Sequence, residues 1–255
     1  MSQAAYFQVE QVSFSIAETK ILKEISLEIG AGEQVAMIGP SGAGKTSLLR
    51  VLCGGVTPNS GTVKLDGETY LKNGAQGGPS LRSLRSKVGF VHQDHALVPN
   101  LRVVQNVVAG KFGQRGFWNS LRSLIQPVQR DQEEVFALLE RVGIGEKMFH
   151  RVDSLSGGQQ QRAAIARALF QHPEALLADE PVASVDPARA QAVLNLLISI
   201  SRERGLTLAV SLHDPSLALD LFPRVIGLRE GRVHFDLPSC QVSEKMLGEL
   251  YRLEE

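Results

Sequence analysis

The sequence has 255 residues, of which 43% are hydrophobic and 21% charged, a balance typical of a folded globular protein and not of a disordered or fibrous one. Its 27 Lys and Arg residues equal its 27 Asp and Glu residues, which excludes a strong overall charge that would draw the protein onto nucleic acid. No stretch approaches the about 18 to 20 apolar residues of a membrane span, and residues 1–12 lack the regions of a signal peptide, so we expect a chain that is neither secreted nor transmembrane.

The first third of the chain alternates short β-type runs with turns. Residues 7–12, 25–29 and 61–65 are predicted to form an antiparallel β layer. Between them, residues 34–38 form an apolar run that ends at a glycine-rich loop, and Leu48, Leu49 and Leu52 follow at helical spacing. This order predicts a strand, a loop and a helix.

The middle of the chain is predicted to be mostly helical, and the last third is predicted to alternate strands with helices. Residues 66–86 are rich in glycine and poor in large apolar residues, which indicates an exposed loop. Residues 131–142 carry an apolar stripe at helical spacing. Short apolar strands are then predicted at 175–178, 206–212 and 225–228, with a helix at 188–204. Strands that alternate with helices predict an α/β fold with a mostly parallel sheet.

The two cysteines, Cys53 and Cys240, are far apart and have no metal-binding spacing. A disulfide framework and a structural zinc site are therefore not supported, and we expect both thiols to be structural in a reducing compartment. Cys53 is predicted to be a small core residue at the end of an apolar helix face.

A phosphate-binding loop is predicted directly after the strand at 34–38. The segment Gly39-Pro40-Ser41-Gly42-Ala43-Gly44-Lys45-Thr46-Ser47 contains the pattern G-x-x-x-x-G-K-[ST]. Glycines let successive N–H groups point at phosphate oxygens, and the following helix start adds favourable charge. Lys45 would contact the β and γ phosphates, and the Thr46 hydroxyl would ligate Mg²⁺. The motif predicts ATP binding with Mg²⁺ but does not define the function.

Two further motifs lie in the second half of the chain. An apolar run ends at Asp179 and Glu180, where the first carboxylate would hold Mg²⁺ through water and the second would act as general base. A run of apolar residues followed by Asp-Glu is common in proteins. It supports a nucleotide site only in combination with the phosphate loop. The segment Leu155-Ser156-Gly157-Gly158-Gln159 would place a serine cap and two glycines at a helix start, which exposes N–H groups to an anion.

In this order and spacing, the three motifs resemble those of the ATP-binding cassette (ABC) family, whose signature is the Leu-Ser-Gly-Gly-Gln string. The resemblance covers nearly the whole chain. It implies the P-loop NTPase-type ABC ATPase fold: one domain over 1–255, with a nucleotide-binding core and antiparallel β layer at 1–94 and 166–255, and a helical signature subdomain at 95–165.

The resemblance also implies roles for single polar residues. Gln93 is similar to the glutamine that senses the γ-phosphate and Mg²⁺, and His213 to a switch histidine that contacts the γ-phosphate. Ser184 and Asp186 resemble the loop exchanged across the family's dimer interface. The family pairs two copies head to tail, so that the signature of one covers the ATP on the phosphate loop of the other. A homodimer is therefore expected.

Two departures from the family pattern stand out. Ile16 occupies the position where an aromatic ring normally stacks on adenine, which bears on base selectivity. Val185 stands where leucine is commoner, a change between two apolar residues of similar size.

The resemblance further implies a transporter subunit. Lacking a membrane span of its own, the chain would work with two transmembrane permease subunits and a periplasmic or extracellular substrate-binding protein, at the cytoplasmic face of the cell membrane. Soluble cassette ATPases of DNA repair or translation are the alternative class, and they usually carry a coiled-coil insertion or two fused cassettes, which are absent here. A regulatory module without turnover would be expected to lack Glu180.

Three parts of the sequence resemble the phosphonate importer ATPases within the family: residues 106–122, 178–187, and 210–213 together with 224–235. They imply ATP-driven import of phosphonate or a related phosphorus oxyanion. Systems for phosphate, amino acids or lipoprotein export remain alternatives, because the ATPase does not contact the cargo.

Residues 110–130 contain Lys111, Arg115, Arg122 and Arg130, no acidic residue before Asp131, and the only tryptophan, Trp118. One hypothesis places this segment near the permease and the lipid headgroups. The other treats it as a solvated helical face with one packed tryptophan.

Overall fold

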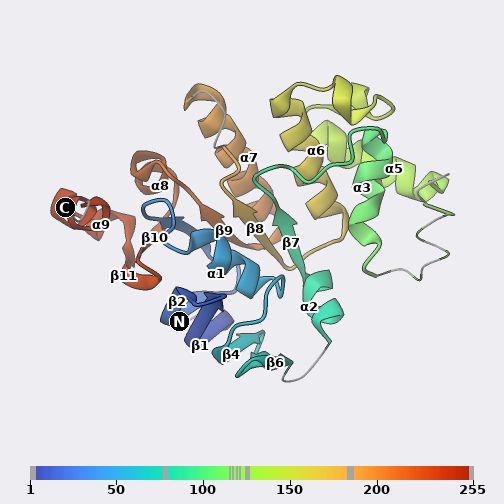
Figure 1. Cartoon of the computed structure of the whole chain (residues 1–255). Helices are drawn as coiled ribbons and strands as arrows, with labels where there is room; N and C mark the ends of the chain where they lie inside the picture. The colour runs from blue at the N-terminus through green and yellow to red at the C-terminus, as the bar shows by residue number, and fades with distance from the viewer. Residues whose placement is uncertain are drawn as a thin grey trace.

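The computed structural model describes residues 4–76, 80–114, 116, 118, 120, 122–123, 127–182 and 187–252. Its first sheet has the order β2-β1-β4-β5-β6, and each of these pairings is antiparallel (Figure 1). The antiparallel layer predicted from the sequence is therefore confirmed. Its strands are β1 (Ala5–Ile16), β2 (Thr19–Gly30), β4 (Ser60–Leu65), β5 (Glu68–Lys72) and β6 (Ala75–Gln76).

The prediction of an exposed loop over 66–86 was wrong. This segment contains β5, β6 and all but the last residue of the helix α2 (Leu81–Lys87), and it buries Tyr70, Leu71 and Leu84 completely. Gly67 and Gly74 adopt positive φ angles of 77° and 78° in the turns that flank β5. The glycines thus serve tight turns between short elements, and a few large apolar side chains are enough to attach these elements to the core.

The second sheet has the order β11-β10-β3-β9-β8-β7, in which β10 through β7 are parallel and only β11 is antiparallel. Every residue of β3, β8 and β9 is buried. Strands that are covered on both faces explain the uninterrupted apolar runs of the sequence. The strands are β3 (Gln34–Ile38), β7 (Val88–Val91), β8 (Ala175–Asp179), β9 (Thr207–Ser211), β10 (Arg224–Arg229) and β11 (Arg232–Pro238).

The helices predicted at 131–142 and 188–204 are present. Helices α3, α5 and α6 pack on one another at one side of the second sheet (Figure 1). Helix α6 continues through residue 165, where the sequence analysis placed the edge of a helical subdomain, so that division stays a proposal. The remaining helix bounds are α1 (Lys45–Leu52), α3 (Val103–Val108), α5 (Gln129–Arg141), α6 (Gly157–Phe170), α7 (Pro187–Arg204), α8 (Pro215–Leu221) and α9 (Glu244–Tyr251). None of the helices described is long and apolar enough to cross a membrane.

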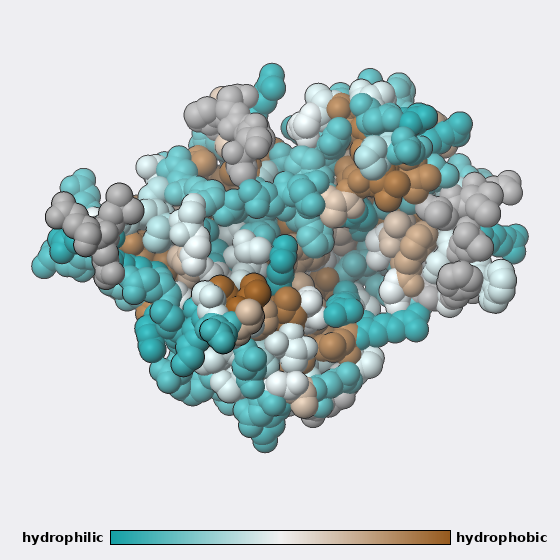
Figure 2. Space-filling model, in the orientation of Figure 1, coloured by the Kyte–Doolittle hydropathy of each residue, from teal (hydrophilic) through white to brown (hydrophobic). Residues whose placement is uncertain are grey.

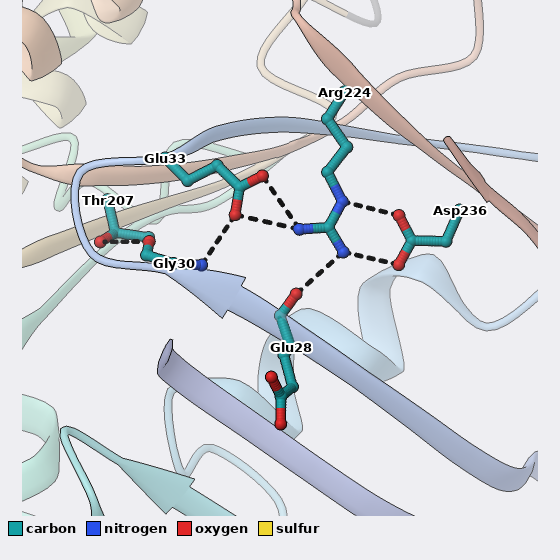
Figure 3. A network of polar contacts seen from close by, with 6 residues as sticks. All are labelled: Glu28, Gly30, Glu33, Thr207, Arg224 and Asp236. Carbon is teal, nitrogen blue, oxygen red and sulfur yellow. Dashed lines mark hydrogen bonds and ion pairs between the residues drawn. The ribbon is translucent and has the colours of Figure 1, made fainter. Parts of the chain in front are cut away.

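A half-buried arginine joins the two sheets (Figure 3). The Arg224 guanidinium on β10 donates to Glu33 Oε1 at 2.9 Å and to Asp236 Oδ2 at 2.6 Å. It also donates to the carbonyl oxygen of Glu28 on β2 at 2.9 Å, while Glu33 accepts the Gly30 amide at 2.7 Å. Hydrogen bonds to Asp236 above all raise the pKa of Arg224. The turn between β2 and β3 is therefore held against β10 and β11.

Candidate functional site

The phosphate loop leaves the buried strand β3 and enters α1 at Lys45. Gly39, Gly42 and Gly44 have φ angles of 149°, 80° and 103°. A Cβ atom on Gly39 would lie 2.0 Å from the carbonyl oxygen of Leu228, and one on Gly44 would lie 2.8 Å from a methyl group of Leu22. Backbone conformation thus favours glycine at all three positions, and packing requires it at Gly39 and Gly44. The loop can therefore curl with its N–H groups inward.

Lys45 lies inside this loop. Its Nζ donates to the carbonyl oxygens of Gly39 at 2.7 Å and Pro40 at 3.2 Å, and the residue is 4% exposed. Burial lowers the pKa of Lys45, and the negative charges of Glu180 and Asp179 partly offset this effect. The buried ammonium therefore stands where the loop could bind phosphates.

The parallel strands bring the other predicted residues to the same edge. Gln93, Glu180 and His213 follow β7, β8 and β9, whose carboxyl ends face the same way as that of β3. In open α/β sheets this edge is where ligands bind. Residues that are far apart in the sequence are thus placed around one site.

Asp179 and Thr46 form the part of the site that fits Mg²⁺. The Thr46 hydroxyl donates to Asp179 Oδ1 at 2.9 Å, and Asp179 is only 3% exposed. Among the residues described, no group of three or more His, Cys, Asp and Glu side chains is arranged to hold a metal ion. Hydroxyl and carboxylate oxygens suit Mg²⁺, which is usually held by few protein ligands together with substrate phosphates. The donor set therefore fits a nucleotide-bound Mg²⁺ better than a metal held by protein alone.

Ser211 connects this pair to Glu180, and the sequence reasoning missed it. Its hydroxyl donates to Asp179 Oδ1 at 2.8 Å and accepts the Glu180 amide at 2.8 Å, and the residue is fully buried. The sequence feature that could have indicated Ser211 is a serine within an apolar strand, two residues before His213.

Glu180 has a φ angle of 46°, uncommon for a residue other than glycine. Its Oε1 lies 2.6 Å from Nε2 of His213.

The loop that carries Gln93 is held by α6. His95 and Ala96 have positive φ angles of 61° and 46°, and the Arg167 guanidinium donates to the carbonyl oxygens of both. Burial lowers the pKa of His95. Arg167 is thus a second supporting residue that the motifs did not indicate.

The signature forms the start of α6, as predicted. Ser156 Oγ accepts the Gln159 amide at 3.4 Å, and Gln159 Oε1 accepts the Ser156 amide at 3.0 Å. A Cβ atom on Gly157 or Gly158 would meet nothing within 4 Å. Packing within this chain therefore does not require glycine at either position.

A cavity of about 720 Å³ separates the signature from Gln93 and Glu180. The surface is hollowed between the parts that carry α6 and α7, and the side chains in view there are mostly hydrophilic (Figure 2). None of the lining residues comes from the phosphate loop. Within one chain, the signature and the phosphate loop thus do not share this cavity.

Four other positions were singled out in the sequence: Ser184, Val185, Asp186 and Ile16. The first three lie outside the described residues. Ile16 is 59% exposed at the end of β1.

The model of the ABC transporter family matches residues 22–183 of this chain. The chain belongs to the ABC transporter family. Similar curated members include the phosphonates import ATP-binding protein PhnC 2 of Pseudomonas aeruginosa (strain UCBPP-PA14), 48% identical over 92% of this chain and 86% of its own. The phosphonates import ATP-binding protein PhnC of Alcaligenes faecalis is 40% identical over 96% of this chain and 87% of its own.

Solved structures of other ABC cassettes are similar in fold. The cassette MJ0796, described as dimeric in a post-hydrolysis state with ADP and Pi, has a TM-score of 0.78 at 30% identity over 91% of this chain and 98% of its own. The cassette cbiO1 of Clostridium perfringens has a TM-score of 0.79 at 27% identity over 96% and 93% of the two chains. The ABC ATPase fold expected from the sequence is therefore confirmed.

Proposed function

We propose that this chain is the ATP-hydrolysing subunit of an ABC importer for phosphonate or a related phosphorus oxyanion. The observation that carries the proposal is the convergence of Lys45, the Asp179–Thr46 pair and the Glu180–His213 pair at one edge of the parallel sheet. The names of the curated relatives at 40% and 48% identity support phosphonate as the cargo.

Each residue has a distinct task in hydrolysis. The N–H groups of residues 39–47 other than Pro40, together with the Lys45 ammonium, bind and orient the ATP phosphates. Thr46, Asp179 and Gln93 would hold Mg²⁺, which neutralises phosphate charge when bound, with Asp179 acting through water. Glu180 accepts a proton from the attacking water, and His213 orients Glu180 and contacts the γ-phosphate.

Two copies are needed to complete the site. Open space in front of Gly157 and Gly158 allows a nucleotide to approach the start of α6, and no phosphate-loop residue of the same chain lines the adjoining cavity. A second chain would bring its own phosphate loop there, so that Ser156 and nearby N–H groups stabilise charge on the partner's γ-phosphate. The dimeric state of the MJ0796 cassette supports this arrangement. Ser184 and Asp186 are proposed to contact the partner.

The membrane partners would be two permease subunits, with a substrate-binding protein on the outer side and this chain on the cytoplasmic face. A groove of about 430 Å³ beside the Gln93 loop offers a place for a cytoplasmic segment of the permease. It is lined by apolar Phe90, Ala109 and Ala168 together with basic Arg85 and Arg167. Movement of a segment seated there would be transmitted to the Gln93 loop, because Arg167 holds that loop.

The basic segment at 110–130 provides weaker support for a membrane contact. Trp118 is 78% exposed, which suits a lipid or permease surface. Lys111, however, is occupied inside the protein, where its Nζ lies 2.9 Å from Glu134 and 3.9 Å from the centre of the Phe170 ring. Arg115 lies outside the described residues. Charge reversal at Arg122, followed by membrane recovery of the assembled transporter, tests this contact.

The proposal is tested by reconstituting the chain in liposomes with the permease and binding protein encoded beside it. Stimulated ATP hydrolysis is expected with a phosphonate or phosphite, and not with an amino acid. Stimulation by phosphate or an amino acid alone would assign another cargo. Lys45→Ala is the matched control, because without the loop ammonium ATP binding or turnover should be lost. If that variant kept both, the phosphate-loop assignment would be wrong.

A further inference from the structure

The last described helix, α9, is fastened to β10, the strand that pairs with β3. Leu250 is completely buried, and the Arg229 guanidinium at the end of β10 donates to the carbonyl oxygen of Glu249. The Ser243 hydroxyl caps the helix by accepting the Met246 amide at 3.3 Å. In Figure 1 this helix lies at the edge of the molecule beside β10 and β11. Its final residue, Tyr251, is therefore held in a defined place.

The Tyr251 hydroxyl contacts the loop that carries His213. It donates to the carbonyl oxygen of His213 at 3.3 Å. Burial chiefly raises the pKa of Tyr251, the backbone of Gly39 opposes this effect, and the charge of Asp214 adds to it. The phenol thus stays protonated at neutral pH and remains a donor.

We infer that Tyr251 is a positioning residue that fixes the backbone of His213 relative to α9, and so aims the His213 imidazole at Glu180. The inference rests on the roles proposed above for these residues. It concerns a helix that none of the nucleotide-binding motifs includes.

The geometry explains why the hydrogen bond from Tyr251 should affect the position of the His213 ring. His213 follows β9, and its imidazole reaches Glu180 Oε1 at 2.6 Å, so a small shift of its backbone moves the ring away from that carboxylate. The amide of Leu212 already donates to the carbonyl oxygen of Met37 at 2.9 Å, which fixes the chain before His213. Tyr251 supplies a contact at His213 itself. Misplacing reacting groups by about 1 Å can cost about 100-fold in rate.

The first test compares ATP hydrolysis by the full-length wild-type protein and Tyr251→Phe, which keeps the ring and loses the hydroxyl. We expect kcat to fall about 3- to 10-fold, the usual effect of one hydrogen bond, with little change in KM for ATP. Lys245→Ala, on the exposed face of the same helix, should leave both constants unchanged. A kcat of Tyr251→Phe within about 2-fold of wild type, or a change in KM alone, overturns the inference.

A double-mutant cycle separates positioning from general support. If Tyr251 acts through the His213 ring, Tyr251→Phe should lower kcat further by less than about 2-fold in a His213→Ala background. An undiminished loss in that background would mean that the hydroxyl acts elsewhere, and the inference would fail.

A second readout does not depend on turnover. The ring resonances of His213, identified by their loss in His213→Ala, should shift in the nuclear magnetic resonance spectrum of Tyr251→Phe and stay in place in Lys245→Ala. Unshifted resonances overturn the inference even if ATP is hydrolysed. Absence of hydrolysis in the wild-type protein would instead count against the proposed function, and the resonances would still decide the role of Tyr251.

Discussion

The carboxylate of Glu180 points at the imidazole of His213, with 2.6 Å between Oε1 and Nε2, while its neighbour Asp179 points at Thr46. Consecutive side chains of a strand point to opposite faces, and at Glu180 the chain leaves the strand with a φ angle of 46°. The Ser211 hydroxyl holds that conformation by accepting the Glu180 amide at 2.8 Å. One carboxylate is thereby available for Mg²⁺ and the other for water.

Replacing Glu180 by Gln should remove the general base and keep the shape of the site. We expect ATP binding to persist while hydrolysis slows by about 10² to 10⁴, the usual contribution of a positioned base. An ATP-bound dimer should accumulate, which size-exclusion chromatography with ATP can detect. Near-normal hydrolysis in a single-turnover assay would remove Glu180 from this role.

Ser211→Ala should impair both carboxylates at once. Loss of the hydroxyl leaves the partly buried Glu180 amide without its acceptor, so we expect a stability loss of about 1 to 3 kcal/mol. We also expect a higher Mg²⁺ concentration at half-maximal ATPase rate. The matched control is Ser201→Ala. Ser201 is equally buried, but its hydroxyl has no hydrogen-bond partner among the described residues, so that variant should be neutral or more stable. Equal effects of the two changes in urea unfolding and in Mg²⁺ titration would contradict the role of Ser211.

Ile16→Tyr tests the departure at the proposed adenine position. An aromatic ring that stacks on a base contributes about 1 to 3 kcal/mol, so ATP affinity should rise about 5-fold or more. Isothermal titration with ATP on the glutamine variant of Glu180 measures this change. Val128→Tyr, at an exposed apolar residue before α5, is the control. If both variants bind ATP as the parent does, Ile16 does not face the base.

Arg224→Ala should destabilise the protein by about 2 to 3 kcal/mol, because two carboxylates lose a shared, half-buried partner. The comparison is Arg232→Ala, which breaks an ion pair between Arg232 and Glu24 that is more than half exposed. That change should cost no more than about 0.5 to 1 kcal/mol. Urea unfolding of both variants provides the values, and similar losses would show that the network of Figure 3 does not join the sheets.

Tyr6 should make stability fall in alkaline solution. Its hydroxyl donates to Glu174 Oε2 at 3.0 Å, and burial, followed by the charge of Glu174, raises its pKa. Above the ordinary tyrosine pKa of about 10, the unfolded chain loses this proton while the folded chain keeps it, so the free energy of unfolding decreases as pH rises.

Tyr6→Phe removes that dependence. Near neutral pH the variant should be about 1 kcal/mol less stable than wild type, because one hydrogen bond is lost. The gap should close above about pH 10, by at most about 1.4 kcal/mol per pH unit. Parallel curves of unfolding free energy against pH would contradict the raised pKa.

Much of this protein could be read from local sequence, because its motifs are contiguous. The phosphate loop, the signature start of α6 and the paired carboxylates each lie in one short segment of the sequence. At Gly39 and Gly44 of the phosphate loop, glycine is also required by the backbone itself. The antiparallel layer and the mostly parallel sheet also followed from strand patterns. The elements of the segment 66–86 could not be predicted in this way. They form because Tyr70, Leu71 and Leu84 reach a core built by distant residues.

The supporting residues became visible only when the strands were brought together. Ser211 is one hydroxyl in an apolar strand, Arg167 one cation on a long helix, and Tyr251 one ring near the end of the chain. Nothing in their neighbours along the sequence distinguishes them from residues that serve packing or solubility. Their contacts with Asp179, the Gln93 loop and His213 span 32, 71 and 38 positions in the sequence. Hydrogen bonds over such separations depend on strand order and helix packing, which no local pattern encodes.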